Sequence, residues 1–159
     1  MENIQNMYQL ILEIDKLKTV FRNTNTDHNR KESTAEHSWS VSMIVIILMT
    51  QLKQEFGDID ELKAIKLALI HDIVEIYAGD VLAFDAAARK EKEAIEAEAL
   101  KKLMAIHPVF GRQLHQLWYE FEDKTSLEAK IAKAPSTRGK TTPPVTAAPK
   151  SIVAIIVTA

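Results

Sequence analysis

The most constraining feature of this chain is a His-Asp step, His71-Asp72, inside an apolar run that covers residues 67–74. A charged group is costly in a protein core unless it is paired or bound to a metal ion. Glu75 follows at the i+3 and i+4 spacings that share one face of a helix. His37 stands upstream, at the start of another apolar segment. We therefore expect two helical segments to hold a divalent cation between them, with hydrolysis as its use.

The rest of the sequence has mostly a helical pattern. Only four glycines and five prolines interrupt 159 residues, and apolar positions recur mostly with the period of a helix. Ser33 and Glu36 form a capping-box pattern, which predicts that a helix opens there. Residues 21–31 are polar and are expected to form a loop, and no segment alternates as a strand would. We predict an all-α fold of about six helices, over residues 3–18, 33–56, 58–78, 86–106, 109–122 and 127–134.

Composition narrows the class of protein. The formal net charge is −2, so no basic surface predicts binding to a nucleic acid polymer. The longest apolar run, residues 43–49, is too short to span a bilayer, and we expect it to be buried in the core. The absence of cysteine excludes disulfides, thiolate metal sites and a cysteine nucleophile, and the N-terminus shows no secretory signal. These observations predict a single domain in the cytoplasm, with no membrane partner.

The last part of the chain differs from the rest in composition. Residues 135–159 contain no Asp or Glu and four of the five prolines, and their apolar end has no amphipathic period. We predict that residues 1–134 form the domain and that residues 135–159 form an irregular tail foreign to it. A frameshift or a misjoined reading frame would produce this change. A natural but disordered extension is the alternative.

Several polar residues near the two histidines are candidates for substrate contacts. Arg22 and Arg30 precede His37, and a guanidinium matches phosphate oxygens in a bidentate fashion. Ordinary surface charge is an equally good interpretation of both arginines. Asp80 follows Gly79, where it would meet a substrate hydroxyl or serve as a turn residue. We expect three further histidines to be solvated: His28, His107 and His115.

Three ordered segments resemble a known family. They are RKESTAEHSW at residues 30–39, LIHDIVE at residues 69–75 and AGDV at residues 78–81. Together they resemble the HD-domain phosphohydrolases, and most of all the branch of the 5'-deoxynucleotidases. LWYEFE at residues 117–122 and EAKIAK at residues 128–133 are also similar to that branch. The resemblance covers roughly residues 4–134, and three ordered motifs are a far more specific signal than any one of them.

The resemblance implies an all-helical HD-domain bundle that hydrolyses nucleoside 5'-monophosphates to nucleoside and phosphate. His37, His71, Asp72 and one later aspartate would hold a divalent metal ion, with Co, Mn, Mg, Zn and Fe as candidates. Members of the family are commonly homodimers. The resemblance also implies roles around the metal: Glu75 for the attacking water, Arg22 for the phosphate, Asp80 for the sugar, and Thr34 or Ser33 for the phosphate end.

The sequence departs from the family pattern at two places. Asn23 follows Arg22, where the deoxynucleotidases have a tryptophan that excludes a ribose 2'-hydroxyl, so a preference for deoxyribose is not implied. Ser136 stands where the family has its last metal aspartate. This second departure supports an alternative hypothesis, a catalytically silent HD module that binds nucleotide or a protein partner. A helical scaffold whose polar residues are purely structural is the third hypothesis, and the three motifs disfavour it.

Overall fold

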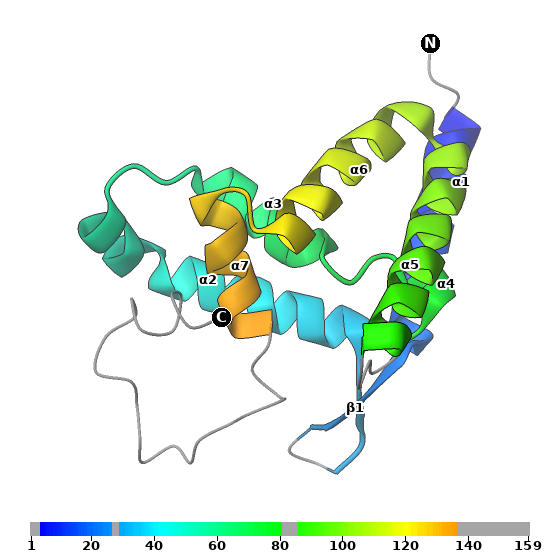
Figure 1. Cartoon of the computed structure of the whole chain (residues 1–159), viewed down its shortest axis with the longest axis horizontal. Helices are drawn as coiled ribbons and strands as arrows, with labels where there is room; N and C mark the ends of the chain where they lie inside the picture. The colour runs from blue at the N-terminus through cyan, green and yellow to red at the C-terminus, as the bar shows by residue number, and fades with distance from the viewer. Residues whose placement is uncertain (1–3, 27–28, 81–85, 137–159) are drawn as a thin grey trace. The chain divides into compact units, whose positions relative to one another are not determined.

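The structure, a computed structural model, describes residues 4–26, 29–80 and 86–136. Its described part is predominantly helical, as predicted, and Figure 1 traces its elements along the chain. They are α1 (Ile4–Asp15), the 3-10 helix η1 (Lys16–Thr19), β1 (Phe21–Asn25), β2 (Lys31–Ser33), α2 (Thr34–Phe56), α3 (Glu61–Ile70), α4 (Glu75–Ala78), α5 (Ala86–Ile106), α6 (Pro108–Asp123) and α7 (Leu127–Ser136). Most of the predicted tail, residues 137–159, lies outside the described residues.

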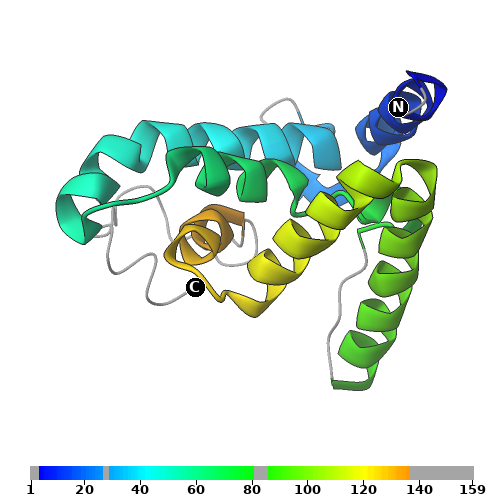
Figure 2. The ribbon, with the colours of Figure 1, turned by 90° about the horizontal axis from the view of Figure 1, so that it is seen from above.

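The chain divides into two compact units. The first comprises described residues 4–36 and 72–116, and the second comprises residues 37–71 and 117–136. In the second unit α7 packs against α3, as Figures 1 and 2 both show. The contact is lined by small side chains, because Ala64, Ala68, Ala129 and Ala132 are all completely buried. Small residues let two helices approach closely, so this pair forms the centre of the unit's core.

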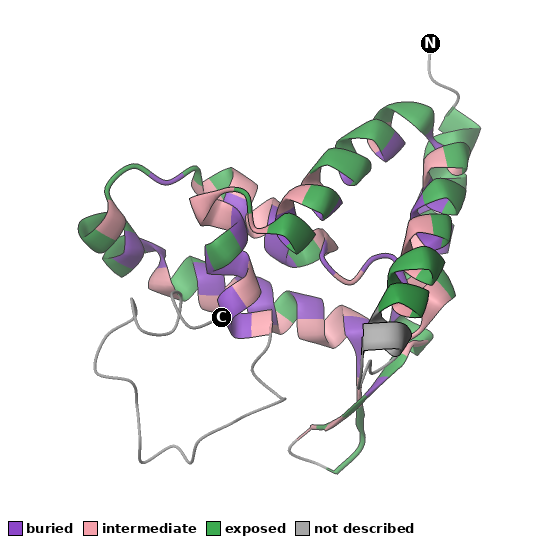
Figure 3. Ribbon diagram, in the orientation of Figure 1, coloured by how far each residue is buried: buried purple, intermediate pink, exposed green. Residues whose placement is uncertain are grey.

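Apolar residues of α2 complete the core of the second unit. Val41, Val45 and Met49 are buried there, at the spacing of one helix face. Figure 3 shows α7 with much of its surface buried as well. The prediction that residues 43–49 are wholly buried is wrong for Ile46 and Ile47, whose residues are 42% and 71% exposed. A continuous apolar run cannot lie on one side of a helix, so part of it faces outward.

In the first unit α5 contacts both α1 and α4, and η1 contacts α4 and β2. The turn between α5 and α6 is tight. A Cβ atom on Gly111 would lie 2.5 Å from the Cα of Met104, so only glycine fits there. His107 precedes Pro108 and accepts a 3.2 Å hydrogen bond from the backbone N–H of Phe110 through Nδ1. His107 is therefore a buried cap of α6, and the prediction that it is solvated is wrong.

The expected loop over residues 21–31 contains a short β-hairpin, which corrects the sequence prediction. β1 and β2 pair antiparallel, with Phe21 opposite Ser33 and Asn25 opposite Lys31. Asn29 turns the chain with φ of 56°, a left-handed conformation that asparagine tolerates better than most residues. The pattern was hidden because β2 has three residues, too few for an alternation to be visible. His28, which the sequence predicts to be solvated in this loop, lies outside the described residues.

The predicted third helix is also interrupted. α3 ends at Ile70, residues 71–74 form turns, and α4 begins at Glu75. The imidazole of His71 donates from Nδ1 to the carbonyl of Ala68 at 2.7 Å. In a continuing helix that carbonyl would accept from the N–H of Asp72. The side chain therefore competes with the helix at the position where the sequence motif lies.

The end of α7, the exposure of His115 and the apolar character of the helices remain to be compared with the predictions. α7 continues through Pro135 to Ser136, two residues beyond the predicted end of the last helix. His115 is exposed, as predicted. Within the described residues, no helix combines the length and the apolar character that crossing a membrane requires.

Candidate active site

The start of α2 places His37 by a local set of hydrogen bonds. The backbone N–H and the hydroxyl of Ser33 both donate to Oε2 of Glu36 at 2.9 Å. The N–H of Glu36 donates back to Oγ of Ser33 at 3.2 Å. This is the predicted capping box, and it satisfies backbone donors that a helix start leaves free. His37 therefore follows on a helix whose first turn is well fixed.

His37 and His71 lie together in the second unit. Their ring centroids are 5.4 Å apart in an edge-on arrangement, and the ring of His71 is also 5.0 Å from that of Phe121. Because a carbonyl only accepts, the bond to Ala68 fixes the proton of the buried His71 on Nδ1. Metal-binding histidines use this device, which directs the other ring nitrogen toward the ion.

Asp72 follows His71 directly and completes a cluster of metal-type ligands. One ligand atom from each of His37, His71 and Asp72 lies within 4.8 Å of the others. Imidazole nitrogen and carboxylate oxygen together suit Zn, Mn, Fe, Co and similar divalent cations. The residues present therefore fit a divalent metal ion.

Arg22 is the cationic partner of this carboxylate in the first unit. Its Nη1 donates to Oδ2 of Asp72 at 2.9 Å, and its Nε lies 3.8 Å from Oε2 of Glu32. The side chain is only 10% exposed, and buried guanidinium charge requires such paired carboxylates. Arg30 behaves differently, because it is exposed and pairs with Glu36. The structure thus separates the two arginines, which the sequence left as equivalent candidates.

Glu75, the first residue of α4, is a buried carboxyl group. The hydroxyl of Thr34 donates to its Oε2 at 2.9 Å, although the two residues are 41 positions apart. Burial raises the pKa of the Glu75 carboxyl to about 8, and the negative charges of Asp72 and Asp80 add to the increase. The hydrogen bond from Thr34 and the charge of Arg22 oppose it. A carboxyl group with this pKa can exchange protons near neutral pH.

Asp80 follows the end of α4. Gly79 adopts φ of 71°, a left-handed conformation that redirects the chain after the helix. Asp80 is half-buried, and its charge acts on Glu75. The structure therefore brings Asp80 to the same region of the first unit as Glu75.

Two other predicted site residues have different surroundings. Ser33 is buried, and its hydroxyl is engaged in the capping box with Glu36. Asn23 is exposed on β1, next to the buried Arg22. Neighbouring strand residues point to opposite faces, so the Asn23 side chain lies on the other face from Arg22.

Lys92 of α5 is a residue that the sequence analysis missed. Burial opposes its charge, yet the carboxylates of Glu96, Glu75 and Asp72 together raise the pKa of its ammonium group. Its Nζ lies 3.4 Å from Glu96. Lys92 stands in a segment crowded with charged residues, RKEKEAIEAE at residues 89–98, so composition alone could not distinguish it.

Comparisons with known proteins identify the family of this chain. The HD domain family model matches residues 14–137. The 5'-deoxynucleotidase HDDC2 of Bos taurus is 31% identical over 132 residues, which cover 81% of this chain and 62% of the relative. The protein of the same name from Dictyostelium discoideum is 32% identical over 74% of this chain and 65% of its own length. The chain thus spans less than two thirds of the length of each of these two curated relatives.

Solved structures show the same relationship. A predicted metal-dependent phosphohydrolase from Magnetospirillum magnetotacticum has a TM-score of 0.74 and 32% identity, over 87% of this chain and 68% of that one. The PH0347 protein of Pyrococcus horikoshii has a TM-score of 0.66 and 26% identity, over 82% and 72%. The family model covers residues 14–137, a range that contains the histidine pair, Asp72 and Glu75. The chain belongs to the HD domain family.

Proposed function

We propose that this chain is a metal-dependent phosphoric monoester hydrolase that removes phosphate from nucleoside 5'-monophosphates. The observation that carries the proposal is the cluster of His37, His71 and Asp72, with Arg22 bonded to the same aspartate. The names of the relatives, 5'-deoxynucleotidase and metal-dependent phosphohydrolase, support the reaction class.

The metal ion would be held by imidazole nitrogens of His37 and His71 and a carboxylate oxygen of Asp72. A divalent cation supplies a lowered pKa for water and neutralises charge on the phosphate. Co, Mn, Mg, Zn and Fe are the candidates, since all accept nitrogen and oxygen ligands.

Arg22 and Glu75 are the proposed catalytic residues. The guanidinium of Arg22 would bind phosphate oxygens while Asp72 keeps it oriented. Glu75 would accept a proton from the attacking water as the new bond to phosphorus forms. The bond from phosphorus to the 5'-oxygen breaks, and Glu75 returns a proton to that oxygen. The raised pKa of Glu75 supports both transfers near neutral pH.

The remaining site residues are proposed to select the substrate. Thr34 and Ser33 would line the phosphate end, with Thr34 acting through its bond to Glu75. Asp80 would accept a hydrogen bond from a sugar hydroxyl. Asn23, whose side chain lies on the opposite face of β1 from that of Arg22, stands where the family pattern has a tryptophan that excludes ribose. We therefore propose that both ribose and deoxyribose substrates are accepted.

We extend the proposal to organisation in the cell. Residues 1–134 would form the catalytic domain of a cytoplasmic homodimer, and residues 135–159 would not belong to that domain. The absence of cysteine is consistent with a reducing compartment.

The test is phosphate release from a panel of ribo- and deoxyribonucleoside monophosphates, with Co, Mn, Mg or Zn supplied. We expect release that depends on the metal and is lost in His71→Ala. Lys53→Gln, which breaks an exposed ion pair with Glu61 in the second unit, is the control and should retain activity. Metal binding without release from any substrate would favour the silent HD module.

Ser136 is the observation that favours this second function, because it stands where the resemblance places the fourth family ligand. Its hydroxyl donates to the carbonyl of Lys133 at 2.8 Å. Lys133 Nζ lies 4.3 Å from the ring centroid of Phe121, which in turn packs 5.0 Å from His71. The last turn of α7 is therefore linked by packing to the histidine pair.

Ser136→Asp tests whether this position lacks a ligand. We expect metal affinity to rise by roughly tenfold or more, because changes around metal ligands commonly have effects of about 10–100-fold. Thr125→Asp adds the same charge at an exposed position before α7 and is the matched control. Equal metal affinity in both variants would remove Ser136 from the proposed site.

A further inference from the structure

α4 carries Glu75 but is only four residues long. A helix this short is not stable by itself, because too few backbone bonds offset the cost of forming the first turn. Its main-chain bonds are local: the N–H of Glu75 donates to Asp72 at 3.0 Å, and that of Gly79 donates to Glu75 at 2.8 Å. The direction in which Glu75 points must therefore be fixed by contacts between α4 and its neighbours.

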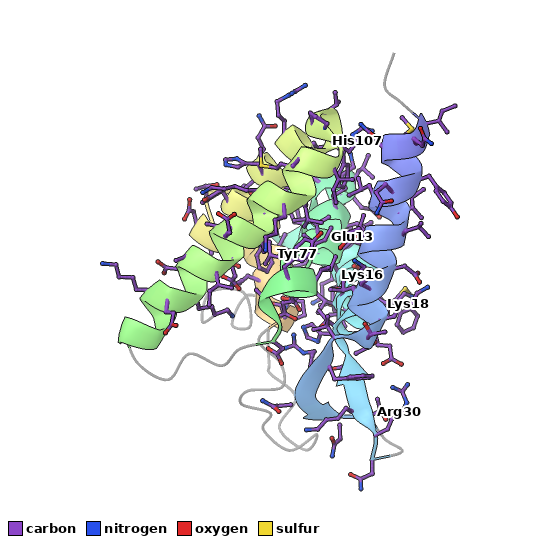
Figure 4. The ribbon with its side chains drawn as sticks, turned by 90° about the vertical axis from the view of Figure 1, so that its right-hand side faces the viewer. Glu13, Lys16, Lys18, Arg30, Tyr77 and His107 are labelled. Carbon is purple, nitrogen blue, oxygen red and sulfur yellow. The ribbon has the colours of Figure 1, made fainter. Side chains whose placement is uncertain are left out.

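Tyr77 connects α4 to α1 in the first unit. Its hydroxyl hydrogen-bonds to the carboxylate of Glu13, and Figure 4 shows both side chains between α4 and α1. Glu13 is a buried residue at 5% exposure, and Nζ of Lys16 lies 2.6 Å from its Oε1. Hydrogen bonds from Lys16 and from Tyr77 hold the pKa of Glu13 below its ordinary value. The carboxylate is therefore charged and paired, as a buried charge must be.

α5 contributes a contact to the same tyrosine. Nζ of Lys102 lies 5.3 Å from the centroid of the Tyr77 ring, within the range of a cation–π interaction. Burial and the bond to Glu13 raise the pKa of Tyr77 to about 12, so its hydroxyl keeps its proton. Tyr77 is thus in contact with α1 at its hydroxyl and with α5 at its ring.

We propose that the hydrogen bond between Tyr77 and Glu13, supported by Lys16, positions α4 so that the Glu75 carboxylate meets the Thr34 hydroxyl. Tyr77 and Glu13 are positioning residues, since they act through Glu75. The inference rests on the proposed function for its effect on turnover. The geometric part, an α4 fixed by Tyr77, is independent of that function.

The geometric part is tested by amide hydrogen exchange. In Tyr77→Phe we expect peptides that cover residues 75–79 to exchange about tenfold faster, while peptides from α3 stay unchanged. Tyr8→Phe is the matched control, because Tyr8 is 62% exposed on α1. Unchanged exchange of α4 in Tyr77→Phe would overturn the proposal, even if the chain proves to have no hydrolase activity.

The catalytic part is tested by kinetics at saturating metal. We expect Tyr77→Phe to lower kcat roughly tenfold with KM within about twofold, since misplacing a reacting group by an ångström costs rate. Glu13→Gln keeps an acceptor for the tyrosine and should retain more activity than Glu13→Ala. In a Thr34→Val background Tyr77→Phe should have little further effect. Additive losses in the double variant would assign Tyr77 a structural role only.

If wild-type protein releases no phosphate, the proposed function fails while the exchange result still decides the positioning. If wild type is active and Tyr77→Phe matches Tyr8→Phe in kcat, the positioning proposal fails while the proposed function stands.

Discussion

Two glutamates stand near helix starts in the first unit, and their environments are opposite. Glu36 lies in the first turn of α2 with its side chain 42% exposed, and Glu75 opens α4 with 4% of the residue exposed. Hydrogen bonds from Arg30, then from the backbone and hydroxyl of Ser33, lower the pKa of Glu36 to about 2. Burial raises the pKa of Glu75 to about 8. The same residue type therefore occupies two environments that shift its pKa in opposite directions.

The difference shows what burial costs and what it allows. Glu36 is charged at every physiological pH. It stabilises the start of α2 by accepting hydrogen bonds from Ser33, three residues earlier, and from Arg30, next to β2. Glu75 accepts a hydrogen bond from Thr34, which comes from a distant part of the sequence. An ionised carboxyl group is poorly stabilised there, which gives Glu75 the proton affinity that acid–base chemistry requires.

The largest expected effect is on turnover. Glu75→Gln keeps the shape of the side chain but cannot move a proton, so we expect kcat to fall by about 10²–10⁴-fold. Glu36→Gln should change kcat by less than about threefold. Metal binding should persist in both variants, since neither residue is among the three metal-type ligands. Steady-state phosphate release measures the comparison, and equal losses in the two variants would contradict it.

The second expected effect is on how the folding stability of the metal-free chain depends on pH. Because the pKa of Glu75 is raised in the folded state, Glu75 contributes stability at pH values below its ordinary pKa of 4.5. This contribution is lost as the pH rises toward about 8. A lowered pKa does the reverse: the contribution of Glu36 is present above 4.5 and is lost as the pH falls toward about 2. Thermal unfolding midpoints should thus become less pH-dependent between pH 4.5 and about 8 in Glu75→Gln, and between about 2 and 4.5 in Glu36→Gln. The same pH profile in wild type and both variants would argue against these environments.

A smaller effect is expected at the capping box. Ser33→Ala removes the acceptor for the N–H of Glu36 and should lower the free energy of unfolding by about 1 kcal/mol. Denaturant titration measures it, and the slope of the unfolding curve should stay constant. Unchanged stability in Ser33→Ala would contradict its role in the cap, and a hundredfold fall in turnover would be the mark of the phosphate contact proposed for Ser33.

The smallest effect is expected from Arg30→Gln. The pair between Arg30 and Glu36 is exposed, and such pairs contribute little because water and salt screen them. We expect the unfolding midpoint of Arg30→Gln to differ from that of wild type by no more than other exposed substitutions do. Phosphate release should be retained. Arg22→Gln is the matched contrast, since that guanidinium is buried against Asp72. Equal phosphate release by Arg22→Gln and Arg30→Gln would show that the buried arginine has no role in turnover that the exposed one lacks.

The comparison also explains what the sequence could predict. The capping box of Ser33 and Glu36 depends on neighbours three residues apart, and its pattern predicted it correctly. The caps of α3 and α7 are equally local, since Asp60 accepts from Lys63 and Ser126 accepts from Ala129. The helical fold and the HD domain family followed from periodicity and from ordered motifs.

Contacts over long sequence distances were not predictable in this way. The bond between Thr34 and Glu75 and the contact of Tyr77 with Glu13 arise only when distant segments fold together. The hairpin was missed because its strands are too short for a pattern, and the break after Ile70 because a side chain competes with the helix. The cap that His107 forms with Phe110 is local, but it was missed because histidine is not among the residue types that usually cap a helix start.

Binding of Mn²⁺ or Co²⁺ to the metal-free chain, measured by calorimetry, tests the central claim most directly. Three ligand side chains clustered within 4.8 Å predict one specific ion per chain in wild type and in Glu75→Gln, and none in His71→Ala or Asp72→Asn. Equal binding by wild type and His71→Ala, or no binding by folded wild type, would contradict the account.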